Sequence, residues 1–461
     1  MKILTSGHVV GLIATLTLAV AFGIHFGRKV RSSSDFIVAG RRATVFTVMG
    51  IIMSTLVGGA ATIGTAQMAF QYGLDGWWFT LGSGLGCLVL ALVLASPLRR
   101  SGMETIPQFL SQVYGPTCGL AAGIFCSVAI FVHVIGQALS GAALLGEMVG
   151  LDLWASSFVT MALAVSFIFF GGVLAQGAVG VLKSVLLYAS LGLSGVLAYR
   201  LSGGFSGLRQ TLEPYPWFSL FGRGFLPDLA AGLSVAIGVM STQTYLQAIF
   251  SGRDVASSRR GAILSAAIIP PIGLGGVLVG LSMRVLHPEI SAASAFPFFI
   301  LRYFPPLLGG VVLATLLITI ISGAAGLILG IATMLTKDVY WTHINPKASD
   351  RKVLLISRLV VLVLAASCFL LTALGGSTLI LQWAYLSMAL RASTVFTPLL
   401  WAIWAKRLVR KTVGVAATII SPLGALAFRI FYPKGPDPLF VGLALSLGIM
   451  IVGHTVRMGS R

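Results

Sequence analysis

The segment MSTLVGGAATIG (Met53–Gly64) is rich in glycine, serine and threonine although it lies inside a long apolar stretch. A second segment of this kind, AGLSVAIG (Ala231–Gly238), is followed closely by STQT (Ser241–Thr244). Small and hydroxyl-bearing residues inside a membrane helix either let neighbouring helices pack closely or mark a point where the helix is interrupted. Each segment taken alone permits both interpretations.

The composition restricts the class of protein. Of 461 residues, 57% are hydrophobic and only 9% are charged, whereas a soluble domain carries about 25% charged residues. These values exclude a soluble enzyme, a disordered protein and a nucleic-acid-binding domain. The net charge of +19 is instead expected from an excess of Lys and Arg on the cytoplasmic side of a membrane protein. The four cysteines lie in apolar runs without metal-ligand spacing, and we expect reduced thiols.

Apolar runs long enough to cross a bilayer, about 20 residues each, occur thirteen times. The first is followed directly by Arg28, Lys29 and Arg31 and by no small-residue cleavage site, a pattern typical of an uncleaved anchor with its N-terminus outside. Thirteen crossings then place the C-terminus in the cytoplasm. We therefore expect an all-α, polytopic protein of the cell (inner or plasma) membrane. Its expected spans are 7–26, 44–72, 77–97, 117–149, 154–174, 178–199, 224–250, 261–285, 307–335, 352–374, 378–404, 412–432 and 437–456.

The spans between residues 44 and 404 form two sets of five. Because five is odd, the second set starts on the opposite side of the membrane from the first, which is typical of an inverted repeat. Each set opens with one of the two Gly/Ser/Thr-rich segments, and this matched placement favours interrupted helices around a site near the membrane centre. The expected divisions are a peripheral helix and loop (1–43), the first repeat (44–202), an external loop (203–222), the second repeat (223–404) and two peripheral helices (405–461).

Several motifs, taken in their order and spacing, resemble the sodium:solute symporter family, which includes proline, sugar and pantothenate symporters. The resemblance implies a LeuT-type fold of two inverted five-helix repeats, with one helix before them and two after. It also implies uptake of a small solute by alternating access, driven by sodium. The motifs are SDFIVAGRR (Ser34–Arg42), the segment Ser54–Gly82, LRRSGMETIPQFLSQVYG (Leu98–Gly115), QTYLQAIFSGRD (Gln243–Asp254), the segment Phe296–Gly323 and TKDVY (Thr336–Tyr340).

The resemblance also implies a sodium site, with sodium as the only metal ion. In the family, backbone carbonyls of the first core helix bind the cation, and these fall here on Ser54 and Val57. The eighth core helix contributes a carbonyl, matching Thr319, and two successive hydroxyls, matching Ser322 and Gly323. One of the two hydroxyls is therefore missing, which weakens the expectation of sodium coupling.

The fifth core helix departs further from the family. An Asp followed three residues later by Gln is common there, and the corresponding residues are Gly180 and Lys183. Three interpretations of Lys183 stay open. Its side chain reaches the cytoplasmic interface, its ammonium occupies the place of the sodium ion, or it contacts the substrate. The second would make the transporter sodium-independent, with proton coupling, uniport or exchange.

Arg391 lies near the middle of the span 378–404. A charge there is costly, and no carboxylate is expected at the same depth. Backbone carbonyls, water or an anionic substrate must therefore satisfy the guanidinium, and the last alternative favours a carboxylate or other anion as solute. The resemblance implies further candidates for substrate binding. They are His133 and Gln137, one turn apart on the third core helix, which lines the pocket in this fold, and Gln243 on the sixth, which matches a recurrent Gln position of the family. A buried His is, however, often only structural.

We therefore expect a secondary active transporter that imports a small polar organic solute, not an enzyme. No cofactor other than a possible sodium ion and no nucleic-acid partner are expected. The lipid bilayer is the expected environment. A channel is a remote alternative, because paired interrupted helices favour alternating access. The sequence leaves the oligomeric state open.

Overall fold

The structure is a computed structural model that describes residues 4–27, 39–375, 378–405, 410–432 and 435–459. The basic residues Arg28, Lys29 and Arg31 and most of the motif Ser34–Arg42 lie outside these ranges. Within the described residues the chain is helical and contains no strand, apart from an isolated bridge between Ala43 and Gly252. The expected all-α class is confirmed.

The first half of the chain runs from a peripheral helix through a series of short elements to two long helices. Its elements are α1 (Ser6–Gly27), η1 (Ala39–Arg41), α3 (Val45–Leu56), η2 (Ala60–Gly64), α4 (Thr65–Tyr72), η3 (Gly73–Trp77), α5 (Trp78–Val89), η4 (Leu90–Leu94), α6 (Ala95–Arg100), α7 (Ile106–Tyr114), α8 (Pro116–Val149) and α9 (Leu153–Leu201).

The second half begins with a short helix in the predicted external loop. Its elements are α10 (Gly204–Thr211), α11 (Phe225–Met240), α12 (Gln243–Ser251), α13 (Val255–Leu286), η5 (Ala292–Ser294), α14 (Ala295–Tyr303), α15 (Pro306–Thr333), η6 (Met334–Ile344), α16 (Asp350–Gly375), α17 (Ile380–Arg391), η7 (Ala392–Phe396), α18 (Thr397–Trp404), α19 (Lys411–Phe431) and α20 (Pro438–Gly459).

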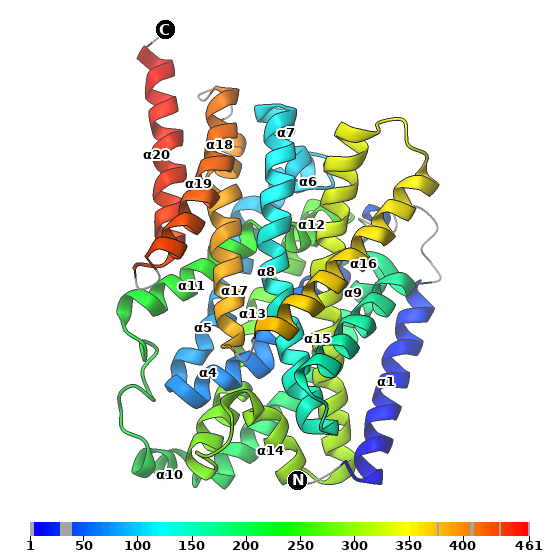
Figure 1. Ribbon diagram of the computed structural model, residues 1–461, viewed down its shortest axis with the longest axis vertical. Helices are drawn as coiled ribbons and strands as arrows, with labels where there is room; N and C mark the ends of the chain where they lie inside the picture. The colour runs from blue at the N-terminus through cyan, green and yellow to red at the C-terminus, as the bar shows by residue number, and fades with distance from the viewer. Residues whose placement is uncertain (1–3, 28–38, 376–377, 406–409, 433–434, 460–461) are drawn as a thin grey trace.

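The helices form one bundle, and the start of α1 and the end of α20 lie at its opposite ends (Figure 1). We name the end that carries α6 and α7 the inner end, and the end that carries α10 and α14 the outer end (Figure 1). In the described residues, ten helices are long and apolar enough to cross a membrane, or eleven if α11 and α12 form one broken span. The predicted spans 154–174 and 178–199 are joined in one helical element, α9. The count of thirteen crossings and the division into repeats stay predictions.

The first Gly/Ser/Thr-rich segment interrupts a helix, as expected. Helix α3 ends at Leu56, Val57 has non-helical backbone angles (φ −88°, ψ 82°), and helical structure resumes at Ala60. Gly58 and Gly59, which lie between α3 and η2, pack closely against α8. A Cβ atom on Gly58 would be only 2.5 Å from Gln137 Nε2. Interruption and close packing therefore occur together. The break leaves backbone carbonyl and N–H groups of this buried segment without helical partners.

The second segment also contains a break. Helix α11 ends at Met240, Thr242 is extended (φ −106°, ψ 121°), and α12 starts at Gln243. The two helices are bent by 42° relative to each other. Interrupted helices at both predicted places are thus confirmed, and they position the polar residues described next.

Candidate functional site

The ammonium group of Lys183 lies at the first helix break. Lys183 is on α9, and its side chain is completely buried. Its Nζ donates hydrogen bonds to the carbonyl oxygens of Ser54 (2.8 Å) and Val57 (2.7 Å) and to Ser322 Oγ (3.0 Å). All three ammonium protons therefore have acceptors, and the side chain points into the bundle rather than toward either end.

Close packing of α9 on α3 brings Lys183 to this position. A Cβ atom on Gly180 would lie 1.9 Å from the carbonyl oxygen of Gly50, and one on Gly50 would lie 2.0 Å from the carbonyl oxygen of Gly177. Only glycines permit two helix backbones to approach this closely. The Asp that the family commonly has at position 180 does not fit here. Gly180 permits the close contact of α9 with α3, and this contact places Lys183 at the break, so the two departures from the family are structurally connected.

The other residues expected at the cation site lie on α15. Ser322 Oγ contacts Lys183 Nζ, and it also lies 3.2 Å from the carbonyl oxygens of Ser54 and Thr319. The carbonyl group of Thr319 is thus one hydrogen bond away from the ammonium. Gly323, which replaces the second hydroxyl, packs on the break, since a Cβ atom there would lie 3.1 Å from Gly58 Cα.

The guanidinium of Arg391 lies at the second break. It is completely buried at the end of α17. Its Nε donates to Ser387 O (3.1 Å), one terminal nitrogen to Thr242 Oγ1 (2.8 Å), and the other to Ser387 Oγ (2.8 Å) and His133 Nδ1 (3.1 Å). Every one of these acceptors is uncharged. Protein groups therefore accept four hydrogen bonds from Arg391 but do not neutralise its charge.

His133 and Gln137 on α8 join the two breaks, and both are completely buried. Gln137 Oε1 accepts a hydrogen bond from Gly59 N (2.7 Å), and Gln137 Nε2 lies 3.4 Å from His133 Nε2. Because Arg391 can only donate, His133 Nδ1 must accept, and the proton of the neutral ring is assigned to Nε2. Two donors, His133 Nε2–H and the Gln137 amide NH₂, then face each other, and neither has an acceptor among the residues that the structure describes.

Two aromatic side chains that the sequence analysis did not single out pack next to this cluster. The Phe79 ring on α5 meets the His133 ring edge-on, with centroids 6.2 Å apart, and lies 6.2 Å from the Tyr385 ring on α17. Both aromatic residues are buried. Phe79 directly follows Trp77 and Trp78. Aromatic residues are common near a membrane surface, so nothing in the sequence distinguished Phe79 from its neighbours.

An ion cluster around Arg223 lies next to Tyr385. Arg223, just before α11, is bound by Asp75 through two contacts (2.5 and 3.2 Å) and by Asp228 at 2.8 Å. The Arg223 guanidinium carbon also lies 5.8 Å from the centre of the Tyr385 ring. Asp75 comes from the turn between α4 and α5 and Asp228 from the first turn of α11, so the cluster connects the segments of both broken helices.

Gln243 lies elsewhere than expected for a substrate ligand. Its Oε1 accepts a hydrogen bond from Ile106 N (2.8 Å), and its Nε2 donates to Glu104 O (3.1 Å). The side-chain amide is therefore bonded to the loop at the inner end, and Arg391 contacts the neighbouring Thr242 instead. Residues 104 and 243 are far apart in the sequence, and the sequence alone does not indicate this contact.

A bundle of long apolar helices with two broken helices, each meeting buried polar groups, is typical of secondary active transporters. Comparison with known proteins gives the family. The sequence profile of the sodium:solute symporter family matches residues 36–418, and the chain belongs to this family. It is accordingly a multi-pass membrane symporter of a small solute and not an enzyme.

Curated relatives are distant. The osmoregulated proline transporter OpuE of Bacillus subtilis (strain 168) is 23% identical over 396 residues, which cover 79% of this chain and 80% of the relative. The uncharacterized symporter YwcA of the same organism is 23% identical over 415 residues, covering 86% and 80%. These identities leave the transported solute open.

Solved structures show the fold. A Na⁺-coupled sialic acid symporter, substrate-bound and outward-open, superposes with a TM-score of 0.80 at 18% identity and covers 98% of this chain and 97% of that one. The nucleobase-cation-symport-1 transporter Mhp1, closed with bromovinylhydantoin bound, gives a TM-score of 0.62 at 13% identity, with 93% and 96% covered. The expected LeuT-type fold is confirmed.

Proposed function

We propose that this symporter imports a small polar organic solute with a carboxylate or other anionic group, and that the ammonium of Lys183 takes the place of sodium. The observation that carries the proposal is the contact of Lys183 Nζ with Ser54 O, Val57 O and Ser322 Oγ. These are residues on which the family resemblance places the sodium ligands. Thr319, the remaining one, contacts the ammonium only through Ser322.

Two cations do not share such a site. The ammonium already uses its three acceptors at 2.7–3.0 Å, and a sodium ion bound to the same oxygens would be its immediate neighbour. Two like charges 4 Å apart repel by about 4 kcal/mol at the effective dielectric constant of about 20 that suits protein sites. Sodium therefore has to displace Lys183, and the site supports sodium-independent transport.

The ammonium also offers a function that sodium lacks. A lysine can release its proton, and the neutral amine would hold the carbonyls of Ser54 and Val57 less strongly, because hydrogen bonds from charged donors are the stronger ones. Release and recovery of this proton would loosen and tighten the first break. Release and recovery of the Lys183 proton would couple transport to protons. If Lys183 keeps its proton throughout the cycle, the protein would work by exchange or uniport.

The charge balance supports an anionic solute. Lys183 and Arg391 are both completely buried, and neither forms an ion pair with a carboxylate in the described residues. Buried charges without a counter-ion are unfavourable, and a carboxylate would supply the missing charge. The facing donors of His133 and Gln137 would both find an acceptor in a carboxylate oxygen.

Counterflow into proteoliposomes tests both parts of the proposal. Purified protein would be reconstituted in choline buffer without sodium and loaded with each member of a panel of carboxylates, paired with the corresponding neutral amides. We expect exchange of at least one carboxylate without sodium and no exchange of its amide. Exchange of neutral compounds only would exclude the anionic solute, and exchange that requires sodium would exclude the role of Lys183.

We further propose that the inner end faces the cytoplasm of a cell (inner or plasma) membrane, with the N-terminus outside. The excess of Lys and Arg that the sequence places on this side supports the orientation. A tag after residue 461 should then resist protease added outside intact cells, and its digestion there would reverse the orientation.

A further inference from the structure

The second helix break carries two adjacent polar residues with different partners. The Thr242 hydroxyl accepts a hydrogen bond from Arg391 and donates one to Gly238 O (2.5 Å). Gln243, the next residue, is completely buried and contacts the inner end of the bundle instead. Any rotation of the chain at this break moves both side chains at once.

Gln243 holds a loop, residues 102–106, which we name the inner loop. Its Oε1 accepts from Ile106 N, which begins α7 and has no partner inside that helix. Its Nε2 donates to the carbonyl oxygen of Glu104. One side chain of α12 thus satisfies a backbone donor and a backbone acceptor of the inner loop.

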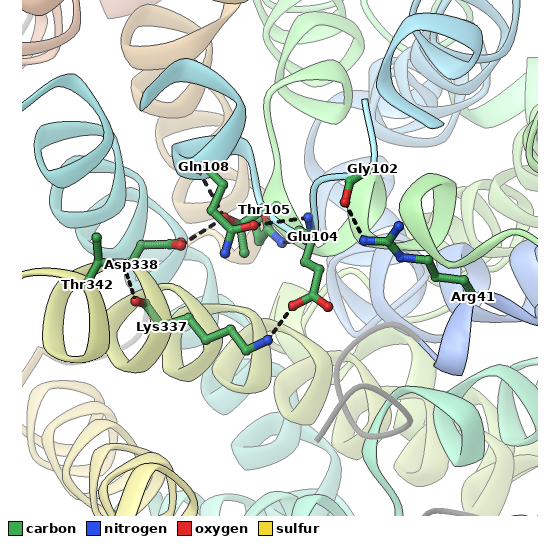
Figure 2. A network of polar contacts seen from close by, with 9 residues as sticks. Arg41, Gly102, Glu104, Thr105, Gln108, Lys337, Asp338 and Thr342 are labelled. Carbon is green, nitrogen blue, oxygen red and sulfur yellow. Dashed lines mark hydrogen bonds and ion pairs between the residues drawn. The ribbon is translucent and has the colours of Figure 1, made fainter. Parts of the chain in front are cut away.

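The opposite side of the inner loop is held by η6, and Figure 2 shows this network. Glu104 forms an ion pair with Lys337, and Thr105 Oγ1 donates to Asp338 Oδ1 (2.9 Å). Arg41, in the segment before α3, donates to the carbonyl oxygen of Gly102. The inner loop therefore connects the lead-in to the first broken helix, the second broken helix and the extension of α15.

We propose that Gln243 is the positioning residue that couples the second break to the inner loop. While the break keeps its present geometry, the amide of Gln243 keeps the loop against α12 and the inner end stays closed. When the break turns, both hydrogen bonds are lost together, and the loop separates from α12. The link from Arg391 through Thr242 to the solute rests on the proposed function, whereas the contact of Gln243 with the loop does not.

The expected size of the effect follows from the two hydrogen bonds. Loss of two ordinary buried hydrogen bonds should change the ratio of open to closed inner ends by about tenfold to a hundredfold. The effect should be one-sided, since both hydrogen bonds of the Gln243 side-chain amide go to the inner loop. A residue that merely stabilised the fold would loosen the bundle without preference for one end.

Labelling of a single introduced cysteine measures this opening. Thr244→Cys is a suitable reporter, because Thr244 is 3% exposed, its hydroxyl has no hydrogen-bond partner in the described part of the chain, and it packs on Gly330 of α15. The four native cysteines are buried, so background labelling should be low. A membrane-impermeant maleimide would be applied to the full-length protein in right-side-out and in inside-out vesicles, without solute and in choline buffer.

Gln243→Leu should raise the labelling rate tenfold or more in the vesicles that expose the inner end, with little change in the others. Gln108→Leu is the matched control, since Gln108 Oε1 also accepts from the inner loop, at Glu104 N, but lies on α7 beside it. This control should change labelling by less than threefold. Gln243→Asn, which keeps a buried amide but shortens its reach, serves if the Leu variant does not fold.

Unchanged labelling in a folded Gln243 variant would overturn the proposal, as would an equal increase from both sides. Because the measurement contains neither solute nor sodium, its failure would leave the sodium-independent function intact. Failure of the counterflow experiment would likewise leave the coupling of Gln243 to the inner loop intact.

Discussion

Replacement of Lys183 by Ala should create a response to sodium that the unmodified protein lacks. The substitution removes the ammonium and leaves the oxygens of Ser54, Val57 and Ser322 without their donor. These oxygens, with the carbonyl of Thr319 nearby, are the kind of ligands that a hard cation prefers in a membrane. A small cation is therefore the natural replacement for the missing ammonium.

The magnitude follows from the repulsion between the two cations. About 4 kcal/mol at 4 Å corresponds to a roughly thousandfold weaker affinity for sodium while Lys183 is present. If the Ala variant bound sodium with a Kd of about 1 mM, the unmodified protein would bind it at about 1 M. At about 100 mM sodium, binding would then stabilise the variant by about 2.7 kcal/mol and the unmodified protein by less than about 0.1 kcal/mol.

Thermal unfolding of the purified protein in detergent measures this difference. Each protein would be heated in sodium chloride and in choline chloride at the same ionic strength. The Tm of the Lys183→Ala variant should rise by a few degrees in sodium, and the Tm of the unmodified protein should not change. A sodium-specific rise of equal size in the unmodified protein would refute the reasoning, because sodium would then bind beside the ammonium.

Three further predictions concern the neighbouring groups. Arg391→Gln should abolish uptake of an anionic solute without loss of expression, and unchanged uptake of the true solute would remove the charge argument. Gly180→Ala should destabilise the protein by about 1–3 kcal/mol or more, because the added methyl group meets α3. Gly192→Ala on the same helix, with open space around it, should not. Equal Tm values for these two variants would contradict the close packing of α9 on α3. Arg223→Gln should destabilise the protein by about 3–5 kcal/mol by leaving buried carboxylates unpaired, and adding Asp75→Asn should restore part of the lost Tm; no restoration would speak against the ion cluster.

The breaks could be predicted from sequence because glycine, serine and threonine gathered at two corresponding places in otherwise apolar runs. The cations could be located as well, since Lys183 and Arg391 are unusual inside membrane spans. The direction of Lys183 could not be decided, because a flexible side chain of this length reaches either an interface or the interior. The packing of Gly180 on Gly50 places its ammonium inside, and such packing depends on the tertiary structure.

Contacts between segments that are far apart in the chain could not be predicted from the sequence. Gln243 was expected to bind the substrate because it matches a recurrent glutamine position of the family, but its amide contacts the inner loop. The contact between the Phe79 and Tyr385 rings depends on how α5 and α17 meet.

Initial uptake rates in proteoliposomes test the central claim most directly. Once a solute is identified by counterflow, its uptake would be measured with an inward sodium gradient and with sodium replaced by choline on both sides. A lysine ammonium at the cation site predicts equal rates in both conditions. Uptake that occurs only with sodium and saturates with sodium concentration would contradict it.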